Sequence, residues 1–364
     1  MRLTRQKKTG AVVGLDIEAG SIAATEVVSN GSTRVSASAI GPLAPGAFHE
    51  GEVLDGDSLA EGLRAFFAEH KLGKQVRLGI ANQRVVVRTL RLPAIEDPKE
   101  MEAAVRFQAQ EQIPMPLDQA VLEHQVVGGV PGEDGSSPQI DVVVVAARRD
   151  MVSTFLAPLR SAGLEPVGVD LSAFAMIRAL AGDTLGEGAA GADGEEATRR
   201  LDEAVLYCNV GDVTNLAVAR DRACLFTRVS HVGLEAIAGR LASAGGLAPE
   251  TAMQWLEHVG LETPVEEIEG EPETVAESRR VLEEGVAALS DEIRLSLDYY
   301  AAQAGALRVG RIVLCGAGSA IAGMEQRMEG LGLPISVARP PALADLGDAS
   351  AARLTLPYGL ALES

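Results

Sequence analysis

The feature that most constrains the fold is a strand–turn–strand unit that occurs twice, once around Asp16 and again 193 positions later around Asn209 (209 − 16). In each copy an apolar strand ends near Asp or Asn, a short turn follows, and a hydroxyl residue (Ser21 or Thr214) stands five positions further on. Exposed N–H groups of a tight turn form a concavity that binds anions. Two such hairpins predict two similar domains that face each other across a phosphate-binding cleft.

The composition favours a globular protein with two domains. The chain has 364 residues, of which 47% are hydrophobic, so each of two domains could bury a proper core. Only 3% of the residues are aromatic, so we expect mainly aliphatic cores. The net charge of −19 argues against a nucleic-acid partner, because neutralising phosphates requires clustered Lys and Arg.

Cysteine placement and the lack of long apolar runs indicate a cytoplasmic protein. Cys208, Cys224 and Cys315 are widely spaced in strand-like sequence, which fits neither a disulfide framework nor a zinc site. No apolar stretch follows the basic residues 2–8, so we expect no signal peptide. No run approaches the ~20 apolar residues that span a bilayer.

Strands and helices alternate along the chain, which places it in the α/β class. We expect helices over residues 57–70, 98–112, 150–162, 234–244 and 279–303, and an acidic helical stretch from 249 to about 273. We expect strands over residues 11–39 (two or three), 76–81, 84–92, 122–127, 140–147 and 311–314. The last strand runs into a glycine-rich turn before a further helix.

Three turns are candidates for ligand binding. At the first hairpin, the Asp16 carboxylate could hold Mg²⁺ through water, while Ser21 and the turn around Gly20 would face phosphates. The second hairpin offers Asn209, Gly211 and Thr214, and the glycine-rich turn offers Gly316, Ala317 and Gly318 to a ribose, a base or a phosphate. The alternatives are ordinary hairpins with polar turns and an ordinary strand–helix turn.

One carboxylate is a candidate catalytic group. Asp170 lies at a strand end near the seam between the two halves, where it could act as a base or bind a metal. The alternative is that it caps the helix expected to start at Leu171. The five histidines show no ligand spacing, and no Ser/His/Asp set can be placed together from the sequence.

The order of these elements resembles the actin/Hsp70/hexokinase superfamily. More narrowly, the chain resembles the PilM family of type IV pilus assembly, which is similar to the cell-division protein FtsA. The resemblance covers nearly the whole chain and is carried by residues 13–17, 88–93, 107–118, 169–175, 213–216, 225–228, 292–300 and 358–362. Residues 113–117 and 298–300 are its most specific parts.

The resemblance implies an actin-like (ribonuclease H-like) α/β fold of two domains with an FtsA-type inserted subdomain. On this chain it predicts a flexible basic tail over 1–10; a domain I formed by 11–83, 148–175 and 346–364; an inserted subdomain over 84–147; and a domain II over 176–345 with a flexible insertion at 183–200. FtsA ends in an amphipathic membrane helix. Here Ser364 closely follows a segment that looks buried, so we expect no such helix.

The resemblance also implies a function. It predicts a cytoplasmic scaffold at the inner face of the cytoplasmic membrane, with ATP and Mg²⁺ between its halves. The scaffold would dock the short N-terminal cytoplasmic tail of PilN and meet other pilus platform and motor proteins, and it would touch the membrane only through them. Whether copies form a homo-oligomer is left open. The PilN groove is expected beside the inserted subdomain, near Leu92, Phe107, Ile113, Pro114 and Met115, residues for which core packing is the alternative.

Three positions depart from the family pattern. Glu18 stands where the family usually has Gly, Asn209 where it has Asp, and Ala23 where it often has Lys. Two like charges about 4 Å apart repel by roughly 4 kcal/mol at an intermediate dielectric constant, so Glu18 would oppose bound phosphate. We therefore expect a degenerate ATPase site in which ATP, if bound, acts as a switch. The rival interpretations are an active ATPase or kinase with Asp170 as base, and a cell-division or type II secretion homologue of the same fold.

Overall fold

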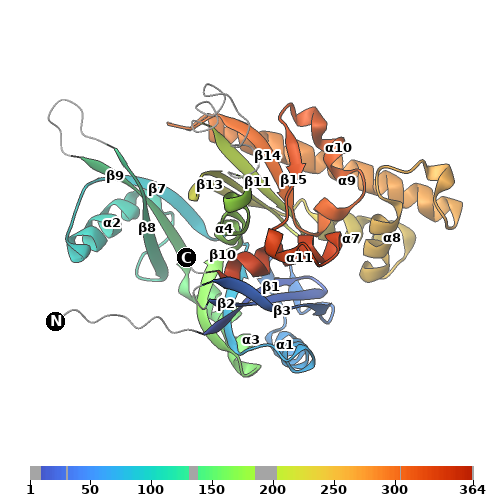
Figure 1. Cartoon of the computed structure of the whole chain (residues 1–364), viewed down its shortest axis with the longest axis horizontal. Coiled ribbons are helices and arrows are strands. Elements are labelled where there is room, and N and C mark those ends of the chain that lie inside the picture. Colours follow the sequence, from blue (N-terminus) through green and yellow to red (C-terminus); the bar gives the residue numbers. More distant parts are fainter. Residues whose placement is uncertain (1–9, 30–31, 131–137, 185–202, 304, 363–364) are drawn as a thin grey trace.

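The computed structural model describes residues 10–29, 32–130, 138–184, 203–303 and 305–362. It contains two five-stranded sheets with two helices between them, and a smaller three-stranded sheet that projects to one side (Figure 1). This arrangement is the α/β, two-domain architecture expected from the sequence. All three cysteines are buried and free, as expected.

The first sheet has the strand order β10-β6-β1-β2-β3. Its strands are β1 (Ala11–Glu18), β2 (Ser21–Ser29), β3 (Thr33–Pro42), β6 (Gln75–Ile80) and β10 (Glu165–Leu171), and the short hairpin of β4 (Phe48–His49) and β5 (Glu52–Val53) lies beside it. Helices α1 (Gly56–His70) and α3 (Arg149–Ser161) pack on its outer face. We call this sheet and its helices the first half.

The second sheet has the order β13-β12-β11-β14-β15. Its strands are β11 (Ala204–Val210), β12 (Thr214–Arg220), β13 (Ala223–Ser230), β14 (Val309–Cys315) and β15 (Ile335–Val337). Its helices are α7 (Leu234–Gly245), α8 (Pro249–Val259), α9 (Pro272–Ala301) and α10 (Met324–Met328), with 3-10 turns at Val265–Glu267, Ala317–Ala320 and Glu329–Leu331. Together they form the second half, whose largest core lies between the sheet and α7, α8 and α9. A further 3-10 turn, Pro341–Leu343, packs on the first sheet and α11.

Helices α4 (Ser172–Thr184) and α11 (Asp348–Ala361) fill the space between the sheets (Figure 1). Apolar residues of α4 pack on the inner face of the second sheet, and Leu354 of α11 packs on Ala23 of the first. Alternate residues of a strand point to opposite faces. Leu15 and Ile17 therefore enter the core under α1 and α3, while Asp16 and Glu18 point toward α11.

The small subdomain consists of β7 (Val86–Pro93), α2 (Pro98–Gln112), β8 (Ala120–Val130) and β9 (Gln139–Arg148), with sheet order β7-β9-β8. Its helix has the bounds predicted from the sequence. The Asp97 side chain caps the first turn by accepting hydrogen bonds from the N–H groups of Lys99 and Glu100. The helix ends because Pro114 follows Ile113, and a residue before proline is pushed into extended conformation.

Three local expectations were wrong. Residues 249–273 do not form one helix, because α8 ends at Gly260, whose positive φ breaks it. Helix α9 begins at Pro272 rather than at 279, since proline suits a first helical turn. The glycine-rich turn leads only into a four-residue 3-10 helix.

Parts of the predicted organisation concern residues outside the described ranges. These parts are nearly all of the basic tail 1–10 and residues 131–137 of the loop 128–138, which joins the strands expected at 122–127 and 140–147. Residues 185–202, which cover most of the insertion expected at 183–200, also lie outside the described ranges. The predicted boundary between residues 175 and 176 falls inside α4, a single helix that contacts both halves. The division into domains stays a prediction.

The close approach of α11 to β1 gives a first prediction. A Cβ atom on Gly14 would overlap the carbonyl oxygen of Pro357, so Gly14→Ala must push α11 off the sheet. We expect a loss of about 1–3 kcal/mol in the free energy of unfolding, measured by urea denaturation. The control is Gly239→Ala on α7, where an added Cβ meets no atom and should stabilise by about 0.5–1 kcal/mol. Equal effects of the two variants would contradict this account.

Candidate functional site

The two hairpin turns meet at the cleft between the halves. The backbone N–H of Ala19, in the first turn, donates a hydrogen bond to the carboxylate of Asp212, in the second. Glu18 lies directly against Gly211, where a Cβ atom would overlap its Oε1. Glycine at position 211 therefore allows the carboxylate of one half to touch the backbone of the other.

Arg353 of α11 occupies the space in front of the first hairpin. Its Nη1 lies 2.5 Å from Asp16 Oδ2, and its Nε lies 2.9 Å from Glu18 Oε2. Its Nε and Nη2 also donate hydrogen bonds of 3.3 Å and 3.2 Å to Ser21 Oγ. Only 7% of Arg353 and 6% of Asp16 are exposed, so this is a buried ion pair. We call Asp16, Glu18, Ser21, Asp212 and Arg353 the Arg353 cluster.

The Arg353 cluster holds three carboxyl groups and one guanidinium, and its pKa values reflect that excess of acid. Burial raises the pKa of Glu18, against the opposing effect of Arg353. Burial and the neighbouring Glu18 hold the pKa of Asp212 well above its usual range, and Glu235 adds to the rise. Burial lowers the pKa of Arg353, but Glu18 and Asp16 outweigh it and the net change is a rise.

The polar groups of the second hairpin also have internal partners. The Thr214 hydroxyl donates to the carbonyl of Val232 at 2.6 Å. Asn209 is 4% exposed, and its Oδ1 faces the thiol of Cys315 at 3.8 Å. In the glycine-rich turn, Gly316 lies against Asn209 and Gly318 against Val210. Ala317 begins the short 3-10 helix of this turn.

A nucleotide does not fit between the two hairpin turns in this conformation. The cavity lined by Asp16, Glu18, Asn209 and Asp212 measures about 30 Å³. Pockets for small ligands usually measure about 300–1,000 Å³, so this cavity has room only for a few water molecules. Asp16, the predicted Mg²⁺ ligand, is engaged by Arg353. Among the described residues, no group of three or more His, Cys, Asp or Glu is arranged to hold a metal ion.

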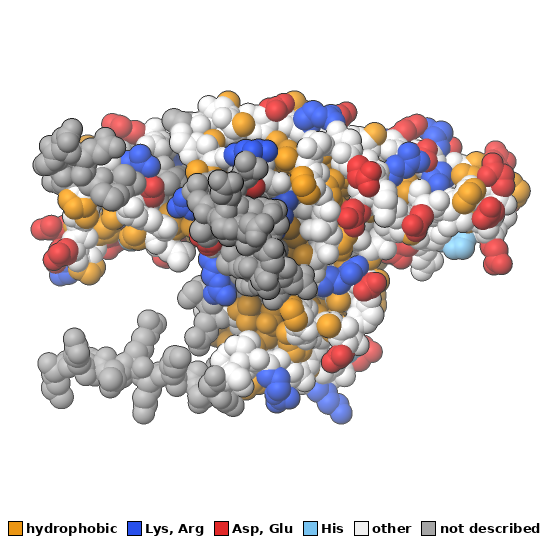
Figure 2. Space-filling view, turned by 45° about the horizontal axis from the view of Figure 1, so that its top comes forward, with side chains coloured by type: hydrophobic (Ala, Val, Ile, Leu, Met, Phe, Trp, Pro, Cys, Tyr) orange, Lys and Arg blue, Asp and Glu red, His pale blue; other side chains and the backbone are white. Residues whose placement is uncertain are grey.

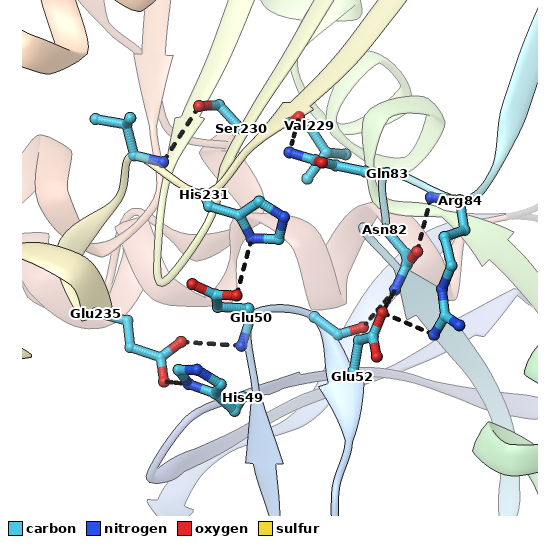
Figure 3. A network of polar contacts seen from close by, with 12 residues as sticks. His49, Glu50, Glu52, Asn82, Gln83, Arg84, Val229, Ser230, His231 and Glu235 are labelled. Atoms are coloured by element: carbon cyan, nitrogen blue, oxygen red, sulfur yellow. Dashed lines mark hydrogen bonds and ion pairs between the residues drawn. The ribbon is translucent and has the colours of Figure 1, made fainter.

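A second polar contact joins the halves beside the first (Figure 3). His49 Nδ1, from β4, lies 2.5 Å from Glu235 Oε1 in the first turn of α7. The N–H of Glu50 donates to the other Glu235 oxygen at 3.1 Å, and His231 Nδ1 lies 3.5 Å from Glu50 Oε2. Gln83 Nε2 donates to the Val229 carbonyl at 3.1 Å. The hydrogen bond to Glu235 raises the pKa of His49, although burial opposes the rise.

A sequence model of the type IV pilus assembly protein PilM matches residues 14–362. The chain belongs to the PilM family.

Solved structures share this fold at low sequence identity. A chain of the PilM-PilN type IV pilus biogenesis complex is 24% identical and has a TM-score of 0.77, with 97% of this chain and 98% of that chain covered. The ethanolamine utilization protein EutJ from Carboxydothermus hydrogenoformans is 16% identical, with a TM-score of 0.54 and coverages of 97% and 89%. MreB 5 of Spiroplasma citri, solved with AMPPNP bound, is 14% identical, with a TM-score of 0.50 and coverages of 97% and 95%. The actin-like fold expected from the sequence is thus confirmed.

The candidate base Asp170 has a structural partner. Its carboxylate lies 2.5 Å from Arg178 Nη2 and accepts a hydrogen bond from the N–H of Leu171 at 2.8 Å. Arg178 also donates to the carbonyl of Gly359 on α11. Asp170 therefore ties β10 to α4 and α11 in this structure, and helix α4 begins at Ser172, one residue later than expected.

The five residues predicted to line the PilN groove separate into two groups. Leu92 and Ile113 are buried in the core of the small subdomain, at 2% and 5% exposure. Phe107 is 67% exposed, Pro114 is exposed and Met115 is half-buried. Only the latter three can meet a partner without rearrangement, so Leu92 and Ile113 support the surface from beneath.

Sequence reasoning missed Arg353 and gave no role to Asp212 or Glu235. One signal was present, because Arg353 is a single charge in the apolar run Ala351–Leu356, and an arginine inside such a run is seldom buried without a partner. The partner itself could not be found, since 337 positions separate Arg353 from Asp16.

The Arg353 cluster leads to a stability prediction. Arg353→Gln leaves Asp16 and Glu18 buried without a cation, and breaking a buried pair in this way costs about 3–5 kcal/mol. We expect a fall of that size in the free energy of unfolding, measured by urea denaturation at neutral pH. The control Arg294→Gln breaks an exposed pair with Asp291 and should cost less than about 1 kcal/mol. A loss in Arg353→Gln no larger than in the control would refute the assignment.

The contact between His49 and Glu235 predicts a pH dependence. A histidine whose pKa is raised on folding stabilises the folded state below its ordinary value of 6.5, and this stabilisation is lost as the pH rises through the raised value. The stability difference between wild type and His49→Gln should therefore shrink as the pH rises from below 6.5, as measured by thermal unfolding across a pH series. The control His124→Gln removes an exposed imidazole on β8, away from the contact. If the stability difference between wild type and His49→Gln instead grew as the pH rose, the prediction would be contradicted.

Proposed function

We propose that this chain is a cytoplasmic scaffold of type IV pilus assembly that docks the N-terminal cytoplasmic tail of PilN at the inner face of the cytoplasmic membrane. The observation that carries the proposal is the match to the PilM family over residues 14–362. The similarity to a chain from a PilM-PilN complex, over 97% of the length, supports the partner. Among the described residues, no helix is long and apolar enough to cross a membrane, so a membrane-anchored partner would provide the attachment.

The docking surface would lie on the small subdomain, around Phe107, Pro114 and Met115. Phe107 is the most exposed of the large hydrophobic side chains in the described residues. Exposed aromatic residues over a well-packed base are typical anchors of protein interfaces. The base here is the core that α2 forms with the three-stranded sheet, including Leu92 and Ile113.

Nucleic acid is not among the proposed partners. On the face drawn in Figure 2, Lys and Arg side chains lie scattered among acidic and hydrophobic ones. Together with the net charge of −19, this distribution gives no continuous stripe of Lys and Arg among the described residues of that face for a phosphate backbone to follow.

Calorimetric titration of the full chain with a peptide of the PilN tail tests the proposal. Phe107→Ala should weaken peptide binding by about tenfold or more, because truncating an interface anchor costs about 2 kcal/mol. The control is Tyr299→Ala, which removes an aromatic side chain of similar exposure (59%) on α9 of the second half. No binding to the wild type would reject the proposed partner. Binding that survives Phe107→Ala, or falls equally in both variants, would place the docking surface elsewhere.

A further inference from the structure

We infer that Arg353 is a built-in cation that occupies the position where a metal would meet Asp16, so that the chain keeps its two halves closed and excludes nucleotide. The actin-like fold and the two hairpins imply a nucleotide site. The residues at that site instead bond to one another. We call the contacts of Arg353 with Glu18, of Glu18 with Gly211 and of Ala19 with Asp212 the latch between the halves.

The first argument concerns the donors and acceptors that a nucleotide would need. Asp16 and Ser21 are bonded to Arg353, the Ala19 amide to Asp212, and the Thr214 hydroxyl to the Val232 backbone. A triphosphate entering the cleft would have to break these contacts. The cavity of about 30 Å³ gives it no room to enter beforehand.

The second argument concerns charge. A triphosphate would meet three carboxyl groups, and among the described residues the cation that pairs with two of them is Arg353. Drawing Arg353 toward the phosphates would leave Asp16 and Glu18 without their counter-ion in a buried site, where an unpaired charge is strongly unfavourable. Restoring the family residues at positions 18 and 209 therefore does not by itself open the site, because Arg353 still covers Asp16.

The third argument concerns mechanics. Arg353 belongs to α11, which packs on the first sheet, and it holds Glu18 through an ion pair. Glu18 in turn lies against Gly211 of the second half, and the neighbouring Ala19 amide bonds Asp212 there. The halves cannot separate at this point unless both contacts are lost. His49 and Glu235 form a second contact between the halves (Figure 3), and Glu235 lies close enough to Glu18 and Asp212 to raise their pKa values.

Nucleotide binding and the distance between the halves together test the inference. The full chain is titrated with a fluorescent ATP analogue and Mg²⁺. In a separate experiment, spin labels at Leu54 and Glu250, one exposed site on each half, report the distance between the halves by pulsed electron paramagnetic resonance. We expect no nucleotide binding by the wild type and one narrow distance distribution that MgATP does not change. Micromolar binding, or a broad distribution that MgATP narrows, would overturn the inference.

Two variants distinguish loss of the latch from a general loss of stability. Arg353→Gln should broaden the distance distribution. The control Arg178→Gln breaks a partly buried Arg–Asp pair that is also bonded to α11, and it should leave the distribution narrow. Equal broadening in both would overturn the latch.

Restoration of the family residues gives a further test. Glu18→Gly with Asn209→Asp should still bind no nucleotide, whereas adding Arg353→Gln should give measurable nucleotide binding. Binding by the double variant alone would show that Arg353 is not what excludes nucleotide. If the triple variant does not fold, the wild-type measurements still decide. Peptide binding is measured separately, so its failure would reject the PilN proposal and leave the latch untouched.

Discussion

The buried contact of Arg353 with Asp16 and Glu18 holds α11 against the first sheet, next to the turn at which the two halves meet. It joins the C-terminal helix to the first strand, positions separated by almost the whole chain. Burying charges costs several kcal/mol per ion, and only good geometry with further hydrogen bonds compensates for it. The guanidinium supplies both, because its planar fork reaches two carboxylates and the Ser21 hydroxyl at once. A lysine could not make all of these contacts together.

The same cluster explains how an actin-like fold can serve as a scaffold. In this structure the groups that would receive phosphates are bonded to other groups of the protein, and the cavity between them measures only about 30 Å³, room for a few water molecules. The surface that remains for a partner is the small subdomain, where Phe107 is exposed over a packed core. Closure of the cleft and exposure of the docking surface lie in different parts of the molecule, so one can persist without the other.

Much of the fold could be predicted because its signals are local. Helix α2 has the expected bounds because Asp97, Pro98 and Pro114 fix its two ends within the sequence itself. The two hairpins lie where the repeat indicated, although the first turn has two residues and the second has three. The error at residues 249–273 arose because acidic, helix-favouring composition continues past Gly260, where the backbone has already left the helix.

By itself, the sequence determined the α/β class, the two hairpins, the family and the departures at Glu18 and Asn209. These follow from residue types and spacings that act over a few positions. Only the tertiary structure decided what those departures do. It placed Arg353 on Asp16, Glu18 against Gly211 and His49 on Glu235. The members of each pair lie 186 or more positions apart, so no local signal in the sequence predicts them. A buried charge must find its partner in space, and the spacing of residues along a chain does not reveal which partner that is.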